Sequence, residues 1–283
     1  MGTHLDHLPT PTTEAGREGL AALLARPDRA VVALDFDGTL AEIVADPEQA
    51  RAHADVLPAL AALAPKIASV VVITGRPAAV AVAHGGFAGV PGLEHLVVLG
   101  HYGAERWDAA SGEVAAPPPH PGLAAVRAEL PALLDGPEAL SGTWVEEKGQ
   151  AIAVHTRRAA DPQAAFELLR EPLGGLAARH GLIVEPGRQV LELRPPGVDK
   201  GVALTAYAAE VGAGSLLYAG DDLGDIAAFV AVEKLRSGGP ERVPGLLVCS
   251  GGTEVPELAG RADVIVPGPA DVAALLAAVA DTV

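Results

Sequence analysis

Two aspartates follow a short apolar segment near the start of the chain, in the sequence VVALDFDGT at residues 31–39. An apolar, β-branched run of this kind predicts a strand that is buried on both faces of a parallel sheet. Ligands of such sheets bind beyond the carboxyl ends of the strands, so Asp35 and Asp37 can face one point from a short loop. Gly38 lets the backbone approach a ligand closely or adopt a positive φ. The segment therefore predicts a ligand site that contains two carboxylates.

Two further groups of polar residues follow apolar segments. Thr74, Gly75 and Arg76 come directly after residues 70–73. Their hydroxyl and backbone N–H groups could donate to phosphate oxygens, or Thr74 could simply cap the next helix. Lys200 begins a long helical pattern. It is either a solvated surface charge or a cation that neutralises the charge on a transferred phosphoryl group.

The sequence GDDLGD at residues 220–225 places Asp221, Asp222 and Asp225 after another apolar segment. Three close carboxylates repel one another unless a cation lies among them, and Mg²⁺ typically combines a few protein carboxylates with water and substrate phosphate. The alternative is an acidic turn that caps the following helix. The net charge of -16 argues against a nucleic-acid or anionic membrane partner, and it also means that an anionic substrate needs a masking cation.

The spacing of the apolar segments predicts an α/β fold with a central parallel sheet. Helical, Ala- and Leu-rich patterns such as 56–63 and 200–211 separate most of these segments, which is typical of βαβ units. The predicted strands cover residues 31–34, 69–73, 96–99, 216–219, 246–248 and 264–266. The polar groups described above therefore all lie at strand ends or at the start of a helix that follows one.

Residues 109–197 interrupt this rhythm. They include a proline-rich linker at 117–121, which should be stiff and extended, and alternating apolar and polar residues at 143–156 and 183–193. Such alternation predicts antiparallel strands with one face on a core and the other solvated. We therefore predict a core formed by residues 1–108 and 198–283, with an inserted α+β domain at 109–197.

The length of 283 residues suits two modest domains, and the single cysteine, Cys249, favours a reducing compartment without disulfides. The start of the chain shows no secretory pattern, and no apolar stretch is long enough to span a membrane. We expect a cytoplasmic monomer that acts on a small molecule.

Taken together, the motifs resemble those of the haloacid dehalogenase-like (HAD) phosphotransferase superfamily. The resemblance implies a Rossmann-like core in which Asp35 is the nucleophile that accepts the phosphoryl group, and in which Asp37 serves as general acid and base. Thr74 would hold phosphate oxygens and Lys200 would balance charge. Further substrate contacts are expected from residues next to these motifs, namely Phe36, Gly75 and Arg76.

The same resemblance implies a Mg²⁺ ion held by Asp35, the backbone carbonyl of Asp37, and Asp221. Asp222 or Asp225 would hold these metal ligands in place from outside the coordination sphere of the ion. A carboxylate can attack a phosphate dianion only if positive charge offsets the repulsion, so the chemistry itself requires a cation and a lysine.

The place of the insertion matches that of α/β cap domains (C2 type) in this superfamily, and among capped members the chain is most similar to the trehalose-6-phosphate phosphatases. The segments GHYGAE at 100–105, VEEKG at 145–149 and GRQVLELRP at 187–195 carry this similarity. The resemblance implies that sugar hydroxyls are recognised by four residues of the cap: Glu147, Lys148, His155 and Glu192. Each of these could instead be a solvated or mutually paired strand residue.

Three places depart from the family pattern. Gly224 stands where a Ser or Thr usually follows the paired aspartates, Ile226 and Ala227 replace a more acidic helix start, and Tyr102 stands where the family often has His. None of these changes removes a group that the reaction requires. The resemblance thus implies a Mg²⁺-dependent hydrolysis of trehalose 6-phosphate through an aspartyl phosphate. The alternatives are a phosphatase for another phosphosugar such as sucrose 6-phosphate or a glycosyl-glycerate phosphate, a phosphomutase, or a non-catalytic metabolite-binding protein.

Overall fold

A computed structural model describes residues 8–44, 46–135, 138–187, 189–251 and 255–283. The chain divides into two compact units, the first formed by Met1–Ala116 with Asp199–Val283 and the second by Pro117–Val198. Residues 1–7, where we expect no secretory signal, and Arg188 of the similarity segment at 187–195 lie outside the described residues.

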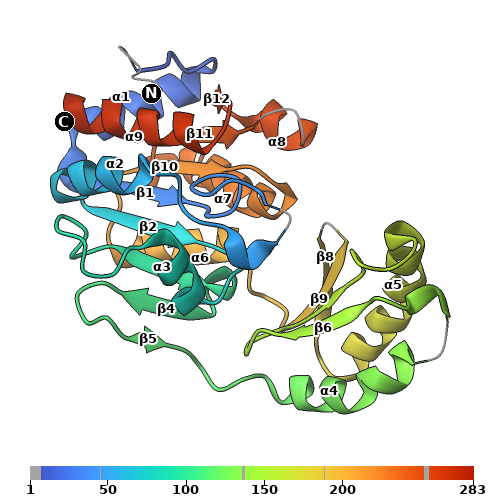
Figure 1. Ribbon diagram of the computed structural model, residues 1–283. Helices are drawn as coiled ribbons and strands as arrows, with labels where there is room; N and C mark the ends of the chain where they lie inside the picture. Colours follow the sequence, from blue (N-terminus) through green and yellow to red (C-terminus); the bar gives the residue numbers. More distant parts are fainter. Residues whose placement is uncertain (1–7, 45, 136–137, 188, 252–254) are drawn as a thin grey trace. The chain divides into compact units, whose positions relative to one another are not determined.

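The first unit contains a sheet with the strand order β12-β11-β10-β1-β2-β3-β4-β5 (Figure 1). All pairs from β12 to β3 are parallel, whereas β4 and β5 pair antiparallel at one edge. The strands are β1 (Ala30–Leu34), β2 (Ser69–Ile73), β3 (Val97–Gly100), β4 (Glu105–Asp108), β5 (Val114–Ala115), β10 (Ser215–Gly220), β11 (Gly245–Ser250) and β12 (Val264–Val266).

Helices cover both faces of this sheet (Figure 1). Val32 and Leu34 of β1 pack toward one face and Val31 and Ala33 toward the other, as expected for a strand that is buried on both sides. The first face is covered by α1 (Glu14–Ala25), α2 (Val56–Leu63), α3 (Ala78–Gly85) and α9 (Pro269–Thr282). The second is covered by α6 (Lys200–Glu210), α7 (Ile226–Arg236) and α8 (Pro256–Arg261). The predicted α/β class with a central, mostly parallel sheet is confirmed.

The first unit extends through Ala116, beyond the start of the insertion predicted at residue 109. The reason is β5, in which Val114 pairs with Trp107 and Ala115 with Arg106, so that the chain adds one more strand to the sheet before it leaves. The apolar segments alone did not indicate this two-residue strand.

The second unit has a four-stranded antiparallel sheet with the order β6-β7-β9-β8. One face packs against two helices around a core that includes Ile152, Val154, Leu191 and Leu193. The strands are β6 (Trp144–Glu147), β7 (Ile152–His155), β8 (Ile183–Gly187) and β9 (Val190–Arg194), and the helices are α4 (Pro121–Leu134) and α5 (Pro162–Arg179).

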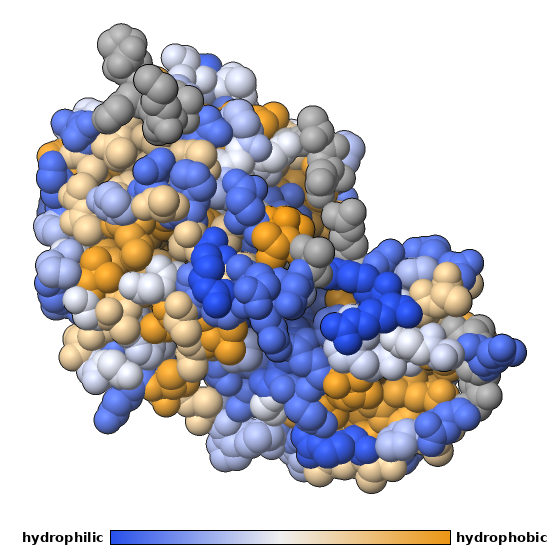
Figure 2. All heavy atoms as spheres, in the orientation of Figure 1, coloured by the Kyte–Doolittle hydropathy of each residue, from blue (hydrophilic) through white to orange (hydrophobic). Residues whose placement is uncertain are grey.

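The helices are rich in alanine, and on the face drawn in Figure 2 apolar residues in orange and tan are interspersed with polar residues in blue over the first unit. Of the helices in the described part of the chain, none combines the length and the hydropathy that a membrane-spanning segment requires.

Candidate active site

The carboxyl ends of β1, β2 and β10 meet at one edge of the first unit's sheet. The register pairs Leu34, the last residue of β1, with Ala219 of β10 and with Val72 of β2. The next residue, Asp35, donates its backbone N–H to the Ala219 carbonyl at 2.9 Å, which continues the ladder by one bond. Asp35 and Thr74 therefore leave the sheet side by side, as expected for parallel strands.

Lys200 joins two carboxylates in the interior of this edge. Its ammonium group lies 2.6 Å from Asp35 Oδ1 and donates to Asp225 Oδ1 at 2.8 Å. The exposed fractions are 3% for Asp35, 4% for Lys200 and 0% for Asp225. Lys200 is the first residue of α6, and the helix is capped by Asp199, whose side chain accepts from the Val202 N–H at 2.8 Å. The cap thus fixes the point from which the lysine enters the cluster.

Both oxygens of Asp225 are anchored. Oδ1 also accepts a 2.6 Å hydrogen bond from the hydroxyl of Tyr218, a fully buried residue of β10. Oδ2 accepts from the backbone N–H groups of Asp221 and Asp222 at 3.0 and 3.1 Å. With Lys200 included, Asp225 accepts four hydrogen bonds, so it fixes the loop that carries Asp221 and the position of the lysine together.

Asp221 packs directly against the loop after β1. A Cβ at Gly38 would lie only 1.9 Å from Asp221 Oδ2, and Gly38 has a φ of +76°, so only glycine fits at this position. The loop is held by a bond from the Ser250 hydroxyl to the Gly38 carbonyl at 2.7 Å and from the Gly38 N–H to the Ala41 carbonyl at 2.7 Å. Close packing therefore brings the second acidic motif against the first.

Burial dominates the electrostatics of this cluster. It raises the pKa of Asp35 well above its ordinary value, an effect that Asp225 increases and Lys200 opposes. Burial, with Asp225 and Asp222, raises the pKa of Asp221 to about 8. Burial alone would lower the pKa of Lys200, but the carboxylates of Asp225 and Asp35 raise it well above its ordinary value. The lysine is therefore charged, whereas Asp35 and Asp221 need further positive charge to ionise fully.

The cluster fits a divalent cation. Asp35, Asp221 and Asp225 offer oxygens that all lie within 4.8 Å of one another, and Lys200 supplies one positive charge to these three carboxylates. Asp221 Oδ1 is buried with no hydrogen-bond partner. Because Asp225 already accepts four hydrogen bonds, Asp35 and Asp221 have the greater remaining capacity as ligands. A hard divalent ion with oxygen ligands matches this donor set and the excess negative charge.

Asp37 faces Arg76 rather than the buried cluster. The Arg76 Nε donates to Asp37 Oδ2 at 2.7 Å and NH2 donates to Oδ1 at 2.6 Å, which is a bidentate pair. The guanidinium also lies 5.7 Å from the centre of the Phe36 ring. The Phe36 side chain itself is fully buried and packs edge-to-face with Phe87. Phe36 therefore does not offer its side chain to a ligand, and only its backbone is available for the predicted substrate contact.

The segment after β2 is braced by the loop after β3, which contains a short 3₁₀ turn at His101–Gly103. Tyr102 donates its backbone N–H to the Thr74 carbonyl at 2.9 Å, and His101 donates to the Arg76 carbonyl at 2.9 Å. A Cβ at Gly75 would lie 2.7 Å from the Tyr102 hydroxyl, so this glycine is required by the close approach of the ring. His101 and Tyr102 both have positive φ, a strained conformation that these contacts hold in place.

The polar face of the second unit's sheet carries a set of paired charges. Lys148 lies 2.7 Å from Glu192 Oε2, and Glu192 is 4% exposed with its other oxygen buried and without a hydrogen-bond partner. His155 pairs with Glu146 at 2.7 Å and stacks on the Trp144 ring at 4.5 Å.

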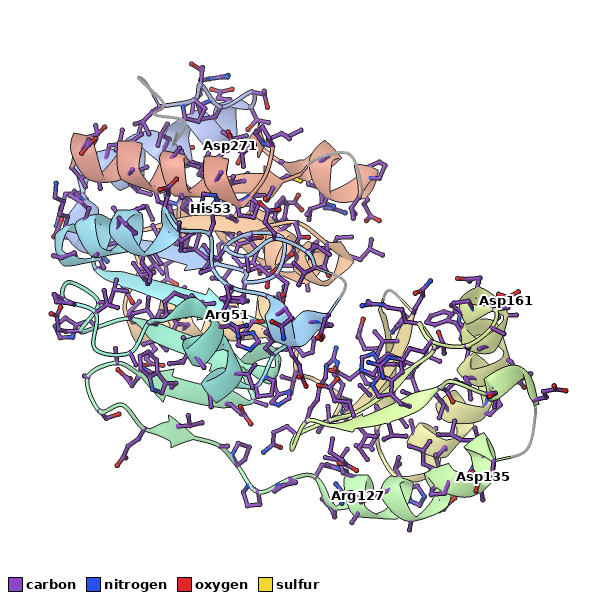
Figure 3. The ribbon with its side chains drawn as sticks, in the orientation of Figure 1. Arg51, His53, Arg127, Asp135, Asp161 and Asp271 are labelled. Carbon is purple, nitrogen blue, oxygen red and sulfur yellow. The ribbon has the colours of Figure 1, made fainter. Side chains whose placement is uncertain are left out.

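The register separates the two adjacent glutamates of β6. Glu146 pairs with Ala153 and shares the polar face, whereas Glu147 pairs with the core residue Ile152. The carboxylate of Glu147 accepts two 2.7 Å hydrogen bonds from Arg127 of α4, which Figure 3 labels. The structure therefore groups Glu146, and not the predicted Glu147, with His155 on one face.

Comparison with known proteins gives the family. The trehalose-phosphatase family model matches residues 33–254, more than half of the chain. The chain belongs to the trehalose-phosphatase family. It is 36% identical over 252 residues to the trehalose-phosphate phosphatase of Mycobacterium avium (strain 104), which covers 82% of this chain and 56% of that protein. A Mycobacterium tuberculosis protein named as an uncharacterized glycosyl hydrolase is 37% identical over 220 residues, 72% of this chain and 15% of that protein. This member of the family thus spans about half the length of such phosphatases.

Solved structures agree with the fold of this trehalose-phosphatase family member. The C-terminal domain of trehalose-6-phosphate phosphatase from C. albicans superposes with a TM-score of 0.74 at 21% identity, covering 98% of this chain and 99% of that one. A trehalose-6-phosphate phosphatase of Aspergillus fumigatus gives 0.68 at 24% identity, covering 97% and 100%. A HAD-like hydrolase of Bacteroides thetaiotaomicron gives 0.59 at 16% identity, covering 87% and 98%. The family predicted from the motifs is confirmed by the family model and the curated relatives, and these solved structures share the fold.

Most of the predicted residues of this family member lie together in one of the two units. In the first unit, Asp35, Lys200, Asp221 and Asp225 form the buried cluster. Asp222 lies at its edge, where its side chain accepts from the Gly224 N–H at 2.9 Å and caps the turn Leu223–Asp225. The predicted backbone contact of Asp37 to a metal stays a prediction.

Motif spacing did not indicate two residues of these sites. Tyr218 lies within an apolar strand, where a Phe would also fit. Its hydroxyl group is the only sequence signal that this position has a hydrogen-bond partner. Glu146 could have been found from Val145, because an apolar residue that faces the core places the residues on either side of it on the opposite face.

Proposed function

We propose that this protein is a Mg²⁺-dependent phosphatase that hydrolyses trehalose 6-phosphate to trehalose and phosphate. The observation that carries the proposal is the buried cluster of Asp35, Lys200 and Asp221 at a sheet edge in a member of the trehalose-phosphatase family. A cluster of this composition suits attack of a carboxylate on a phosphate dianion, since both the lysine and a cation offset the repulsion.

In the proposed first step, a carboxylate oxygen of Asp35 attacks phosphorus and the bond to the sugar oxygen breaks, which leaves an aspartyl phosphate. Lys200 keeps Asp35 oriented through the 2.6 Å contact. Thr74 and the Gly75 N–H, at the adjacent strand end, would donate to phosphate oxygens. Mg²⁺, held by Asp35 and Asp221, would supply the positive charge that stabilises the phosphoryl group during transfer.

Asp37 would exchange protons with the leaving sugar oxygen and with water. In the structure both of its oxygens accept hydrogen bonds from Arg76. This paired arrangement suits the second step, in which Asp37 takes a proton from the water that attacks the aspartyl phosphate. Donation to the leaving oxygen in the first step requires Asp37 to leave this pair and carry a proton.

The second unit would recognise the sugar. Its polar face carries Lys148, His155, Glu192 and Glu146, groups that can donate to and accept from the many hydroxyls of a disaccharide. We propose Glu146 in place of Glu147, because Glu147 is on the helix-covered face and bound to Arg127. The role of the second unit as a substrate-recognising cap is part of this proposal.

A phosphate-release assay tests the function. Trehalose 6-phosphate, sucrose 6-phosphate, a glycosyl-glycerate phosphate and glucose 6-phosphate are compared with and without Mg²⁺. We expect the highest kcat/KM for trehalose 6-phosphate and activity only with the metal. A preference for another phosphosugar would contradict the substrate, isomerised sugar phosphate without free phosphate would indicate a mutase, and no turnover of any phosphate ester would contradict the enzyme class.

Two further proposals concern the state of the protein. A location in the cytoplasm is supported by the presence of a single cysteine in the sequence, which allows no internal disulfide and suits a reducing compartment. We also propose that the protein is a monomer, and light scattering should give the mass of a single chain.

A further inference from the structure

The guanidinium of Arg76 is bound on three sides. Nε and NH2 donate to Asp37, and NH1 donates to the Pro47 carbonyl at 3.0 Å and contacts His84 Nδ1 at 3.3 Å. The exposed fraction of the Arg76 side chain is 14%. His84 lies near the end of α3, and its backbone carbonyl accepts from the Ala52 N–H at 3.1 Å. The partners of Arg76 thus come from three separate segments of the first unit.

The contact with Arg76 determines the protonation state of His84. A guanidinium has five N–H donors and no acceptor, so Nδ1 of His84 must be the acceptor. The imidazole is therefore neutral, with its single proton on Nε2. A protonated ring would instead direct an Nδ1–H toward a cation.

We propose that His84 is a positioning residue that keeps Arg76 in its bidentate pair with Asp37 through a hydrogen bond accepted by Nδ1. The inference rests on the proposed phosphatase activity, in which Asp37 transfers protons. NH1 is the part of the guanidinium that does not touch Asp37, so a bond at NH1 resists rotation of the group away from the carboxylate. His84 acts only through Arg76.

The charges around His84 support a neutral ring. Its pKa is lowered first by partial burial and then by the positive charges of Arg76 and Arg51, while Asp37 and Glu48 act in the opposite direction. Figure 3 labels Arg51, which belongs to the segment between the 3₁₀ turn Pro47–Gln49 and α2. Because the folded protein disfavours the charged ring, His84 remains an acceptor down to a lower pH than an ordinary histidine.

The proposal predicts an effect of acid on the reaction. As the pH falls through the pKa of His84, the ring takes up a proton and the hydrogen bond from Arg76 is lost. Arg76 then holds Asp37 less firmly, and the second step, in which Asp37 takes a proton from the attacking water, slows. Above that pH the bond is intact, and His84 causes no further change.

Nuclear magnetic resonance of the whole protein with ¹⁵N-labelled histidine tests the geometry without any substrate. The signals of His84 are assigned by their loss in His84→Asn. We expect an unprotonated Nδ1 in the neutral state and a titration below that of an ordinary histidine, which shifts to higher pH in Arg76→Ala. A proton on Nδ1, or an unchanged titration in Arg76→Ala, would overturn the proposal.

Kinetics of three variants test the positioning role. His84→Ala removes the acceptor, and we expect kcat to fall about tenfold at pH 7.5, the effect of losing one hydrogen bond to a charged group when the second step limits the rate. His84→Asn places an amide oxygen near the position of Nδ1 and should restore most of the rate. It should also keep a larger share of that rate at pH 5.5 than wild type keeps, because asparagine does not titrate.

The matched control is His53→Asn. His53 belongs to the segment that precedes α2, is labelled in Figure 3, and lies 3.8 Å from Asp55, its ion-pair partner. We expect it to behave as wild type. A loss in His84→Ala that His84→Asn does not rescue, or equal pH profiles for wild type and His84→Asn, would overturn the positioning role. If wild type lacks phosphatase activity, the proposed function fails, while the resonance experiment still tests the contact between His84 and Arg76.

Discussion

The two charged regions of this protein differ in how their charges are held. In the first unit, Asp35, Lys200 and Asp225 are at most 4% exposed, and Asp225 is fixed by four hydrogen bonds. On the polar face of the second unit, Glu146 keeps 47% of its side chain exposed, and the buried Glu192 is held through one oxygen only, by Lys148. A buried network with many bonds is strong and preorganised but costs much free energy when broken, whereas isolated pairs with an exposed partner rearrange more easily. The difference suits the proposed chemistry in the first region and the proposed recognition of sugar in the second.

The largest expected effect is on activity. Asp35→Asn keeps the size of the side chain but removes the proposed nucleophile, so we expect kcat to fall by about 10⁴-fold or more. The assay is phosphate release from trehalose 6-phosphate. Asp271→Asn is the matched control, because Asp271 lies in the first turn of α9 and makes no part of the site (Figure 3). Turnover of Asp35→Asn close to wild type would show that Asp35 is not the nucleophile.

The second prediction compares Lys200 of the buried cluster with Lys148 of the polar face. Lys200→Met leaves Asp35 and Asp225 buried without their cation, so the free energy of unfolding of the first unit should fall by about 3–5 kcal/mol. Lys148→Met leaves Glu192 unpaired on the polar face, and the loss in the second unit should be about 1–3 kcal/mol. Urea denaturation with a probe in each unit measures both. Equal losses in the free energy of unfolding would show that the charges of the two units are held with similar strength, which would contradict the contrast.

The third prediction concerns pH in the absence of metal. Because folding raises the pKa of Asp221 from 3.8 to about 8, the folded state binds its proton more tightly than the unfolded chain does. This contribution to the free energy of unfolding is therefore lost as the pH rises through that range. Mg²⁺ binds the ionised form, so its effect on Tm should grow from pH 5 to pH 8 and reach about 5–10 °C.

Asp221→Asn supplies the control for the pH experiment. With one of the two carboxylate ligands removed, the gain in Tm on adding Mg²⁺ should be small at both pH 5 and pH 8. A gain that is the same at pH 5 and pH 8 in the unmodified protein would mean that Asp221 does not take part in metal binding.

The smallest effect is expected on the polar face of the second unit. Glu146→Gln should raise KM for trehalose 6-phosphate about tenfold with little change in kcat, because only a contact to the sugar is weakened. Glu147→Gln, one position along, should leave KM unchanged, since Glu147 binds Arg127. Steady-state kinetics of the two variants measure this. The reverse order of effects would restore the prediction made from the sequence.

The contrast between the two units also explains what the sequence could predict. Asp35, Thr74 and Asp221 follow apolar strands, and parallel strands bring their carboxyl ends to one edge, so their meeting follows from the pattern alone. The helix that starts at Lys200 was predicted from its pattern. The position of the Lys200 side chain in the cluster depends in addition on the helix cap that Asp199 provides.

Other features depended on register and on side-chain conformation. Glu146 and Glu147 exchange faces with a shift of one residue in β6, and the hairpin with β7 sets that register. The bond from Tyr218 to Asp225 and the pair of Arg76 with Asp37 join residues whose partners the motifs do not name. Local sequence does not determine which side chains meet in such contacts, because packing of the whole unit does.

The central claim is that Asp35, Lys200 and Asp221 together hold a cation and accept a phosphoryl group. A crystal structure of the protein with Mg²⁺ and beryllium fluoride, a mimic of the aspartyl phosphate, tests it most directly. We expect beryllium fluoride bonded through beryllium to a carboxylate oxygen of Asp35. We also expect a Mg²⁺ ion in contact with Asp35 and Asp221, and Lys200 still bound to Asp35. An adduct elsewhere, or a metal ion that touches neither aspartate, would contradict the account.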